Sequence, residues 1–242
     1  MEQRISVAID APALQGKALW LEAGTVRFLA ILNETTAPKR FGGVLLLHDS
    51  GTHADWHEVI NPLRRQLTAH GWDSLSLQMP VTNDPPDSDA LQALLAEASP
   101  RIQAAVDYLS NRQIGNLVFV GHGLGAIMAL NHATDRPSKS IHGIVAIGLS
   151  MPLDNEQDPA YRAITGLEIP ILDLFGSRDL ASVTGSAAAR RRAAAKNPRA
   201  KYRQDMSAGA DHFFKGLQDH LVTRVRAWLR RTAVSATQTS KP

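Results

Sequence analysis

Several polar turns, each placed at the end of an apolar stretch, carry most of the residues in this chain that could do chemistry. The turn at 121–125 reads GHGLG between an apolar strand and an apolar helix. In a G-x-S-x-G turn of this kind, the central serine is a nucleophile and the flanking glycines permit a sharp bend. The central residue here is Gly123, so the setting is present but the hydroxyl group is not. The backbone N–H of Leu124 would still face the place where an oxyanion develops.

Two later turns supply a carboxylate and an imidazole. The stretch LFGSRDL places Asp179 after an apolar strand, and SAGADHFF places His212 before the last helix. A catalytic triad needs a histidine base oriented by an acid. The order 123, 179, 212 is the order nucleophile, acid, base. Asp179 and Asp211 could instead cap the helices that follow them. Asp173, which lies inside the strand, is a weaker candidate for the acid.

The turn after an early apolar strand, LLLHDSGTH, is where a second oxyanion N–H would arise. His48, Asp49, Ser50 and Gly51 occupy it. Asp49 is an unfavourable occupant, because a carboxylate beside a developing oxyanion opposes its stabilisation unless the side chain points away. Ser50 and Ser150 both end strands and are the candidates for a replacement hydroxyl, but neither can be assigned.

Apolar strands alternate with amphipathic helices along most of the chain, which predicts a mainly parallel sheet covered on both faces. We expect one domain over 1–232 and a mobile tail at 233–242. The stretch 150–168 is too short for a large cap domain, and 80–99 could form a partial lid. We expect strands at 18–22, 25–32, 43–51, 73–80, 116–121, 141–150, 169–176 and 200–206, and helices at 54–71, within 81–99, and at 100–111, 124–134, 181–196 and 212–231.

These turns, in this order, resemble the α/β-hydrolase superfamily from about residue 17 to 231. The resemblance implies an α/β-hydrolase fold with a mostly parallel sheet, helices on both faces and no large cap. The stretches WLEAGTVRFLAI, GGVLLLHDSGTHADWHEVINPLRRQL, GHGLGA and YRQ further resemble an uncharacterised bacterial hydrolase-like family in which glycine at this elbow is common. That narrower resemblance implies no substrate.

Two other kinds of site are disfavoured. At the glycine-rich turn, Ala126 replaces the third glycine of a nucleotide-binding motif, which is a permitted variant. Nucleotide binding is disfavoured because the strand is central rather than first and no acidic residue ends the next strand. His53 and His57, four residues apart, could hold a metal ion with Asp55. They straddle a helix start at which Asp55 is a natural N-cap, so we expect structural roles, with no metal and no cofactor. His122, beside the elbow, is expected to be a packing residue.

Composition excludes some classes and leaves others open. The chain has 242 residues, 44% of them hydrophobic, which suits one domain with a sizeable core. It lacks cysteine, which excludes disulfides and thiolate chemistry. The net charge is +3, and arginine and lysine gather in 190–203 and 224–231. Contact with nucleic acid or an anionic membrane is disfavoured, because such a charge run is usually a solvated helix face. No aromatic residue interleaves with the run at 190–201, which argues further against a base-stacking surface there. No leader is visible, so we expect a cytoplasmic protein, or a periplasmic one if a leader has been removed.

The sequence therefore favours a protein with a hydrolase fold that lacks ordinary serine-hydrolase activity. Its expected role is that of a pseudoenzyme that binds a small acyl ligand or a protein partner. One alternative is an active hydrolase of esters, thioesters or other acyl compounds, using water activated by His212 or an unassigned nucleophile. Another is an anion-binding or nucleic-acid-binding regulatory module that uses the basic helices. Gly123 as an introduced replacement for serine also stays open.

Overall fold

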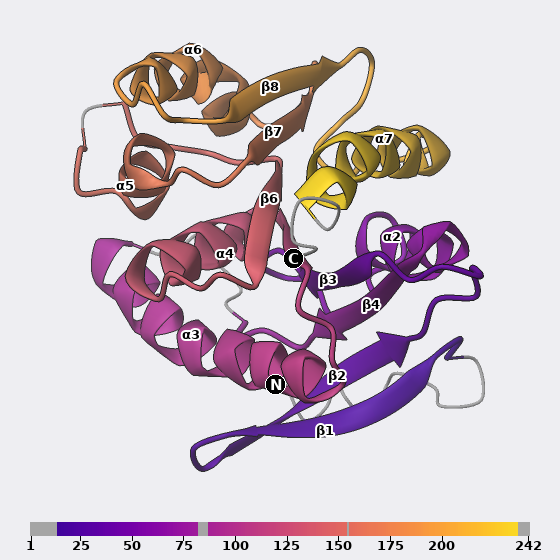
Figure 1. Cartoon of the computed structure of the whole chain (residues 1–242). Coiled ribbons are helices and arrows are strands. Elements are labelled where there is room, and N and C mark those ends of the chain that lie inside the picture. The colour runs from indigo at the N-terminus through magenta and orange to yellow at the C-terminus, as the bar shows by residue number, and fades with distance from the viewer. Residues whose placement is uncertain (1–13, 82–86, 154, 237–242) are drawn as a thin grey trace.

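The computed structural model describes residues 14–81, 87–153 and 155–236, whose strands form one sheet in the order β1-β2-β4-β3-β5-β6-β7-β8 (Figure 1). β1 pairs antiparallel with β2, and β2 pairs antiparallel with β4. The pairings from β4 through β3 to β8 are all parallel. The strands are β1 Lys17–Ala23, β2 Val26–Asn33, β3 Gly42–Leu47, β4 Trp72–Leu77, β5 Leu117–His122, β6 Ile141–Ile147, β7 Ile171–Gly176 and β8 Tyr202–Ser207.

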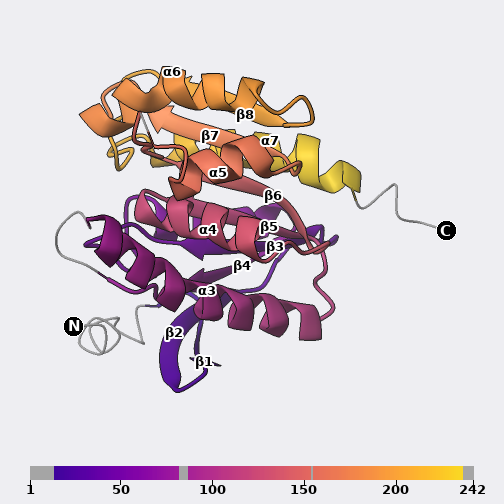
Figure 2. The ribbon, with the colours of Figure 1, turned by 90° about the vertical axis from the view of Figure 1, so that its left-hand side faces the viewer.

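Helices cover both faces of this sheet. Figures 1 and 2 show α3, α4, α5 and α6 on one face and α7 on the other, and Figure 1 shows α2 on the same side as α7. Their bounds are α2 Ile60–Gln66, the 3-10 helix η1 Leu67–His70, α3 Ser88–Asn111, α4 Leu124–Asp135, α5 Pro159–Gly166, α6 Ala181–Ala195 and α7 Gln218–Ala236. The predicted fold class, a mostly parallel sheet flanked by helices without a large cap domain, is confirmed for the described residues. None of the helices in this part of the chain is both long and apolar enough to cross a bilayer.

The central strands show why the sheet needs cover on both sides. Leu45 and Leu47 of β3 join the apolar cluster under α3 and α4, whereas Val44 and Leu46 join the cluster under α2 and α7. All four side chains are fully buried. Since successive side chains of a strand point to opposite faces, an unbroken apolar run specifies two covered faces. The same arrangement brings the carboxyl ends of β3, β5 and β7 to one edge of the sheet.

Four helix predictions are wrong in their bounds. The helix expected over 54–71 begins only at Ile60, because 54–59 form turns in which Asp55 binds Asn61 and Arg64 instead of capping the helix. The two helices expected around Pro100 are one helix, α3, whose apolar face continues through the proline from Leu95 to Leu109. Burial of that face outweighs the hydrogen bond that the proline removes.

The last helix begins at Gln218 rather than at residue 212, and it extends to Ala236, into the stretch expected as a mobile tail. The rest of that tail, 237–242, lies outside the described residues. So do 82–86 of the predicted partial lid and the start of the chain, 1–13.

Candidate active site

The sharp turn between β5 and α4 places Gly123 at the edge of the sheet. Its backbone has φ 52° and ψ −117°, a conformation that side chains disfavour and glycine adopts readily. A Cβ atom at this position would overlap the carboxylate of Asp49. Gly123 therefore does two things: it permits the turn, and it leaves room for a side chain from another strand.

Asp49 fills that room from the turn after β3. Its Oδ1 accepts hydrogen bonds from the backbone N–H of Leu124 at 2.7 Å and of Ser50 at 2.8 Å. Its Oδ2 lies 2.9 Å from Nε2 of His212. The Asp49 side chain points into the site. The N–H of Leu124, expected to face an oxyanion, donates to it, and so does the N–H of Ser50, in the turn expected to supply the second donor. Asp49 therefore points toward the oxyanion position, the orientation that was expected to be unfavourable. No oxyanion is repelled, because Oδ1 of Asp49 itself occupies the place of the oxyanion and accepts its hydrogen bonds.

Asp179 holds the other side of the imidazole. Nδ1 of His212 lies 2.6 Å from Oδ1 of Asp179. The backbone N–H groups of Leu180 and Gly176 also donate to this carboxylate, at 2.8 and 3.2 Å. Asp179 also accepts the N–H of Leu180, but Leu180 is the N-cap residue of α6 and forms no side-chain cap, so Asp179 is the partner of His212 rather than the cap of that helix. The structure brings together Gly123, Asp179 and His212, the residues named as a vacant triad, and adds Asp49 to them.

The charges in this row of side chains reinforce one another. Burial alone would lower the pKa of His212, but its hydrogen bonds and charge contacts with Asp179 and Asp49 outweigh burial and raise the pKa to about 9. Burial would raise the pKa of Asp49, but the hydrogen bond with His212 and the nearby imidazoles and N–H groups lower it. Asp179 follows the same pattern, and its pKa is also lowered. At neutral pH the site is an imidazolium between two carboxylates.

Two further histidines support the site without lining it. His48 accepts the N–H of Met79 at Nε2, 3.0 Å away, so its Nδ1 donates to the carbonyl of Asp49 at 2.7 Å. Burial lowers the pKa of His48 to about 4, and the neutral ring anchors the turn that carries Asp49. His122 lies against His212, with ring centroids 4.6 Å apart, and its Nε2 donates to the backbone carbonyl of His212. The packing role expected for His122 agrees with this placement.

A pocket of about 320 Å³ lies in front of Asp49, Gly123 and His212. Its walls are mainly apolar and include Leu91, Leu124, Ile127, Pro152, Leu180 and Val183. Leu180 is 54% exposed, so apolar surface continues to the mouth. A small apolar molecule would fit against the charged pair at the inner end.

The remaining predicted residues fall in different places. Ser50 contributes its backbone N–H to Asp49, and both Ser50 and Ser150 line the pocket. Gly51 follows in the same turn with φ 68°, but it does not line the pocket. Asp173, the weaker candidate for the acid, forms a buried ion pair with Arg190 instead, with Nε of Arg190 donating to Oδ2 of Asp173 at 2.7 Å. The structure therefore favours Asp179 over Asp173 as the partner of His212.

Metal binding was weighed for His53, Asp55 and His57, but these residues contact different partners. Asp55 binds Arg64, and His57 is paired with Glu58. Among the described residues, Asp49, His122 and His212 offer ligand atoms within 4.8 Å of one another. A cation there would have to break the contact between Asp49 and His212, because both oxygens of Asp49 and both nitrogens of His212 already have partners.

The placement of Asp49 was the main feature that the sequence interpretation missed. Two residues in the sequence could have indicated it: position 123 is a glycine, which has no side chain, and the turn that faces it carries a short acidic residue, Asp49. The sequence alone does not give the distance between these turns, so the direction of the Asp49 side chain could not be deduced.

Solved structures of other proteins share the fold of this chain. A Butyrivibrio proteoclasticus protein, Est1E, has a similar structure with a TM-score of 0.69 at 15% identity, covering 89% of this chain and 98% of its own. A dienelactone hydrolase from Anabaena variabilis gives a TM-score of 0.70 at 19% identity, covering 90% of this chain and 98% of its own. An α/β serine hydrolase homologue from Coxiella burnetii gives 0.69 at 13% identity, covering 89% and 98%.

At these identities the likeness shows the fold, which is that of the α/β hydrolases. No curated protein matches the sequence. A family model described as protein of unknown function (DUF3530) matches residues 3–99 and 81–231. The chain therefore belongs to the DUF3530 family and has the α/β-hydrolase fold.

Proposed function

We propose that this protein performs no serine-type acyl transfer and is a pseudoenzyme toward esters and thioesters, with a pocket that binds a small apolar molecule. One observation carries the proposal: the carboxylate of Asp49 occupies the space of the nucleophile side chain and accepts the hydrogen bonds of the N–H groups of Leu124 and Ser50. An ester carbonyl would find no hydroxyl group at the elbow to attack it, and the N–H groups of Leu124 and Ser50 already donate to Asp49.

The imidazole is also unsuited to activating water in the resting site. With its pKa raised to about 9, His212 is protonated at neutral pH and has no free nitrogen to accept a proton. This argues against the alternative in which His212 activates water directly. The apolar pocket remains available to a ligand.

The test measures separately how Gly123 and Asp49 each prevent serine-type hydrolysis. We would measure hydrolysis of p-nitrophenyl acetate, butyrate and octanoate, and labelling by a fluorophosphonate, in the parent, Gly123→Ser, Asp49→Ala and the double variant. We expect no activity in the parent or in Gly123→Ser, because the serine side chain would collide with Asp49. The double variant should gain labelling and His212-dependent turnover on the order of 10²-fold above the rate without protein.

Adding His212→Ala to the double variant is the matched control, and it should remove the gain. Thermal unfolding of each variant shows whether it is folded. Ester hydrolysis by the parent that disappears with His212→Ala would overturn the proposal. So would a Gly123→Ser variant as active as the double variant.

A second candidate function rests on the way Asp49 is held. Its Oδ1 receives two N–H bonds while Oδ2 faces the pocket beside His212, which is the geometry a carboxylate nucleophile requires. Oδ2 could attack an sp³ carbon that carries a leaving group, displacing the leaving group and forming an alkyl ester of Asp49. The ester is neutral, so the pKa of His212 would fall and the imidazole could lose its proton.

In the second half of this reaction, His212 would take a proton from water while the water oxygen attacks Cγ of Asp49. The oxyanion would form on Oδ1, between the N–H groups of Leu124 and Ser50. Its collapse releases the alcohol and restores the carboxylate, so the net reaction turns an alkyl halide and water into an alcohol and a hydrogen halide. This would make Asp49 the nucleophile that the sequence left unassigned.

Bromide release from 1-bromobutane distinguishes the two candidates. The carboxylate mechanism expects release by the parent, none with Asp49→Asn, and a butyl ester on residue 49 in His212→Gln, visible by mass spectrometry. Turnover in H₂¹⁸O would also place ¹⁸O in Asp49. Absence of both release and adduct would remove this candidate and leave the binding role.

A further inference from the structure

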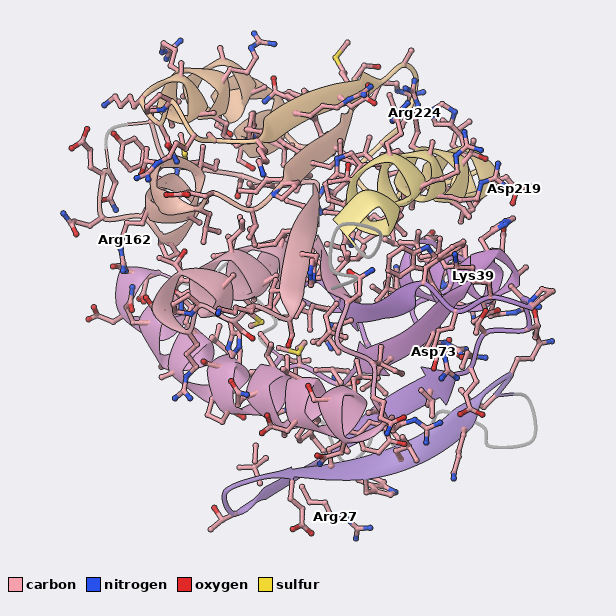
Figure 3. All side chains as sticks on the ribbon, viewed as in Figure 1. Arg27, Lys39, Asp73, Arg162, Asp219 and Arg224 are labelled. Atoms are coloured by element: carbon pink, nitrogen blue, oxygen red, sulfur yellow. The ribbon has the colours of Figure 1, made fainter. Side chains whose placement is uncertain are left out.

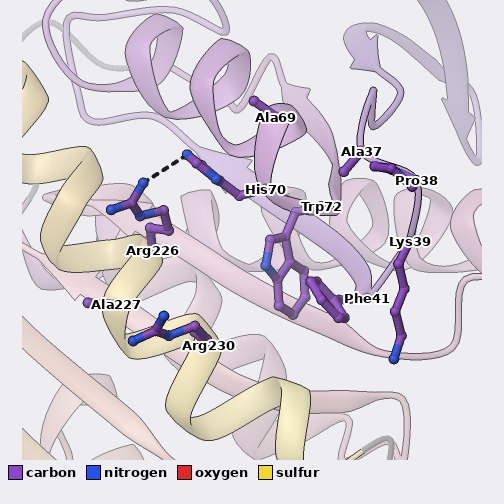
Figure 4. A pocket seen from close by; sticks show the side chains of 10 residues that line it. All are labelled: Ala37, Pro38, Lys39, Phe41, Ala69, His70, Trp72, Arg226, Ala227 and Arg230. Carbon is purple, nitrogen blue, oxygen red and sulfur yellow. Dashed lines mark hydrogen bonds between the residues drawn. The ribbon is translucent and has the colours of Figure 1, made fainter.

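A second cavity lies at the opposite edge of the sheet from the active site. It has a volume of about 650 Å³, opens to solvent, and is bordered by the segment 37–41, by η1 and by α7 (Figure 4). Phe41 directly precedes β3, and Trp72 is the first residue of β4. The cavity is therefore at the amino ends of these strands, whereas Asp49 and Gly123 follow the carboxyl ends of β3 and β5. Its size falls within the range of small-molecule sites.

Positive charge surrounds this cavity. Lys39, Arg226 and Arg230 line it, and none of its lining residues is acidic. Within the described part of the chain, no carboxylate pairs with any of these three cations. Figure 4 shows the two arginines, from α7, on one side of the Phe41 and Trp72 rings and Lys39 on the other. Figure 3 also places Lys39 on the side of the molecule where α7 lies.

One of the arginines is held in position. Nη1 of Arg226 donates to Nε2 of His70 at 3.1 Å, so the imidazole acts as a neutral acceptor. This bond fixes the direction of one guanidinium group and leaves its other N–H groups available. Arg230, one helical turn further along α7, presents its guanidinium group to the same cavity.

The walls between the cations are apolar. Phe41 is half-buried, and Ala37, Pro38, Ala69 and Ala227 complete the lining beside the edge of Trp72. The Nζ atom of Lys39 lies 5.5 Å from the centre of the Phe41 ring. Arginine and lysine side chains bind aromatic faces as well as anions. The cavity therefore combines an apolar floor with cations at its rim.

We propose that this cavity binds a small organic anion built on an aromatic ring, with the anionic group between the cations and the ring against Phe41. Inorganic anions alone would use only the rim, and neutral aromatic compounds only the floor. The site is separate from the active site, and the proposal does not depend on the function of Asp49. It restricts the alternative of an anion-binding module, which the sequence left open, to one cavity beside α7.

Calorimetric titration with 1-naphthyl phosphate tests the proposal, with inorganic phosphate and 1-naphthol as the two partial ligands. We expect 1-naphthyl phosphate to bind at least about tenfold more tightly than either. Arg226→Gln and Arg230→Gln should each weaken it about fivefold, the effect of one partly exposed charge contact. Phe41→Leu should weaken 1-naphthyl phosphate but leave inorganic phosphate unchanged.

Arg192→Gln is the matched control, because Arg192 is an exposed arginine on α6, outside the cavity. It should leave the affinity unchanged. An equal loss in Arg192→Gln and Arg230→Gln would show attraction to the general surface charge and overturn the proposal. Equal affinities for 1-naphthyl phosphate and inorganic phosphate, or no saturable binding at millimolar concentration, would also overturn it.

Discussion

Replacing Asp49 by asparagine should lower the pKa of His212 while keeping the shape of the site. The oxygen of the asparagine amide can still accept the N–H groups of Leu124 and Ser50, so the turn is preserved. The imidazole, however, loses one of the two carboxylates that hold it protonated. What remains is Asp179 on the other nitrogen.

The size of the effect follows from the pKa shift. A rise from 6.5 to about 9 corresponds to a preference for the charged imidazole of about 3 kcal/mol. Both carboxylates contribute, so loss of Asp49 should lower the pKa by at least about one unit, or about 1.4 kcal/mol. The side chain of His212 is 8% exposed, so screening by solvent reduces this little.

The assay is an NMR titration of the imidazole Cε1–H signals between pH 5 and 10, with His212→Gln used to assign the signal. A parent His212 that titrates within half a unit of 6.5 would refute the charge argument. So would a pKa that Asp49→Asn leaves unchanged, since Asp49 would then contribute nothing to the charged form.

The same shift makes stability depend on pH with a definite sign. The folded pKa of His212 is raised above its unfolded value, so its stabilisation is complete below about pH 6.5 and is lost as the pH rises through about 9. Asp49→Asn should therefore lower the free energy of unfolding more at pH 6 than at pH 10. Urea unfolding of both proteins at the two pH values measures this difference, and an equal loss at both would contradict it.

Two further predictions concern stability, each with a matched control. Gly123→Ala should lower the free energy of unfolding by more than Gly209→Ala, because both glycines have positive φ but only the first would drive a Cβ into the carboxylate of Asp49. We expect about 1 kcal/mol for the control and at least about 2 kcal/mol more for Gly123→Ala, measured by urea unfolding, and equal costs would contradict the overlap. Asp173→Ala should cost about 3–5 kcal/mol, because it leaves the buried arginine beside it without a counter-charge. Asp135→Ala removes an exposed ion pair and should cost less than about 1 kcal/mol, and similar thermal shifts in the two variants would refute the distinction.

The sheet could be predicted from the sequence because its evidence is local. A run such as GVLLL needs cover on both faces wherever it lies, and GHGLG between a strand and a helix specifies a tight turn. Chain order then identified Asp179 and His212, which the structure places in contact. These inferences required only the order of elements and the rule that such sites lie at the carboxyl ends of strands.

Other features depended on contacts between distant segments. The position of Asp55 in the sequence suggests an N-cap. In the structure Asp55 binds Arg64, nine residues later, and the helix begins only at Ile60. Pro100 looks like a boundary, yet α3 continues because its apolar face packs against the sheet on both sides of the proline. The direction of Asp49 depends on a turn 74 residues away, at Gly123, and no periodicity in the sequence records that distance.

The overlap between position 123 and Asp49 also limits how this site can change over evolutionary time. A serine acquired first would collide with the carboxylate, and loss of the carboxylate first would leave an empty elbow. Neither single step yields a working serine nucleophile, so the two positions are tied by epistasis. Within the family, glycine at the elbow and aspartate in the facing turn should therefore be gained and lost together, and a member with serine at the elbow should carry a smaller, uncharged residue in that turn.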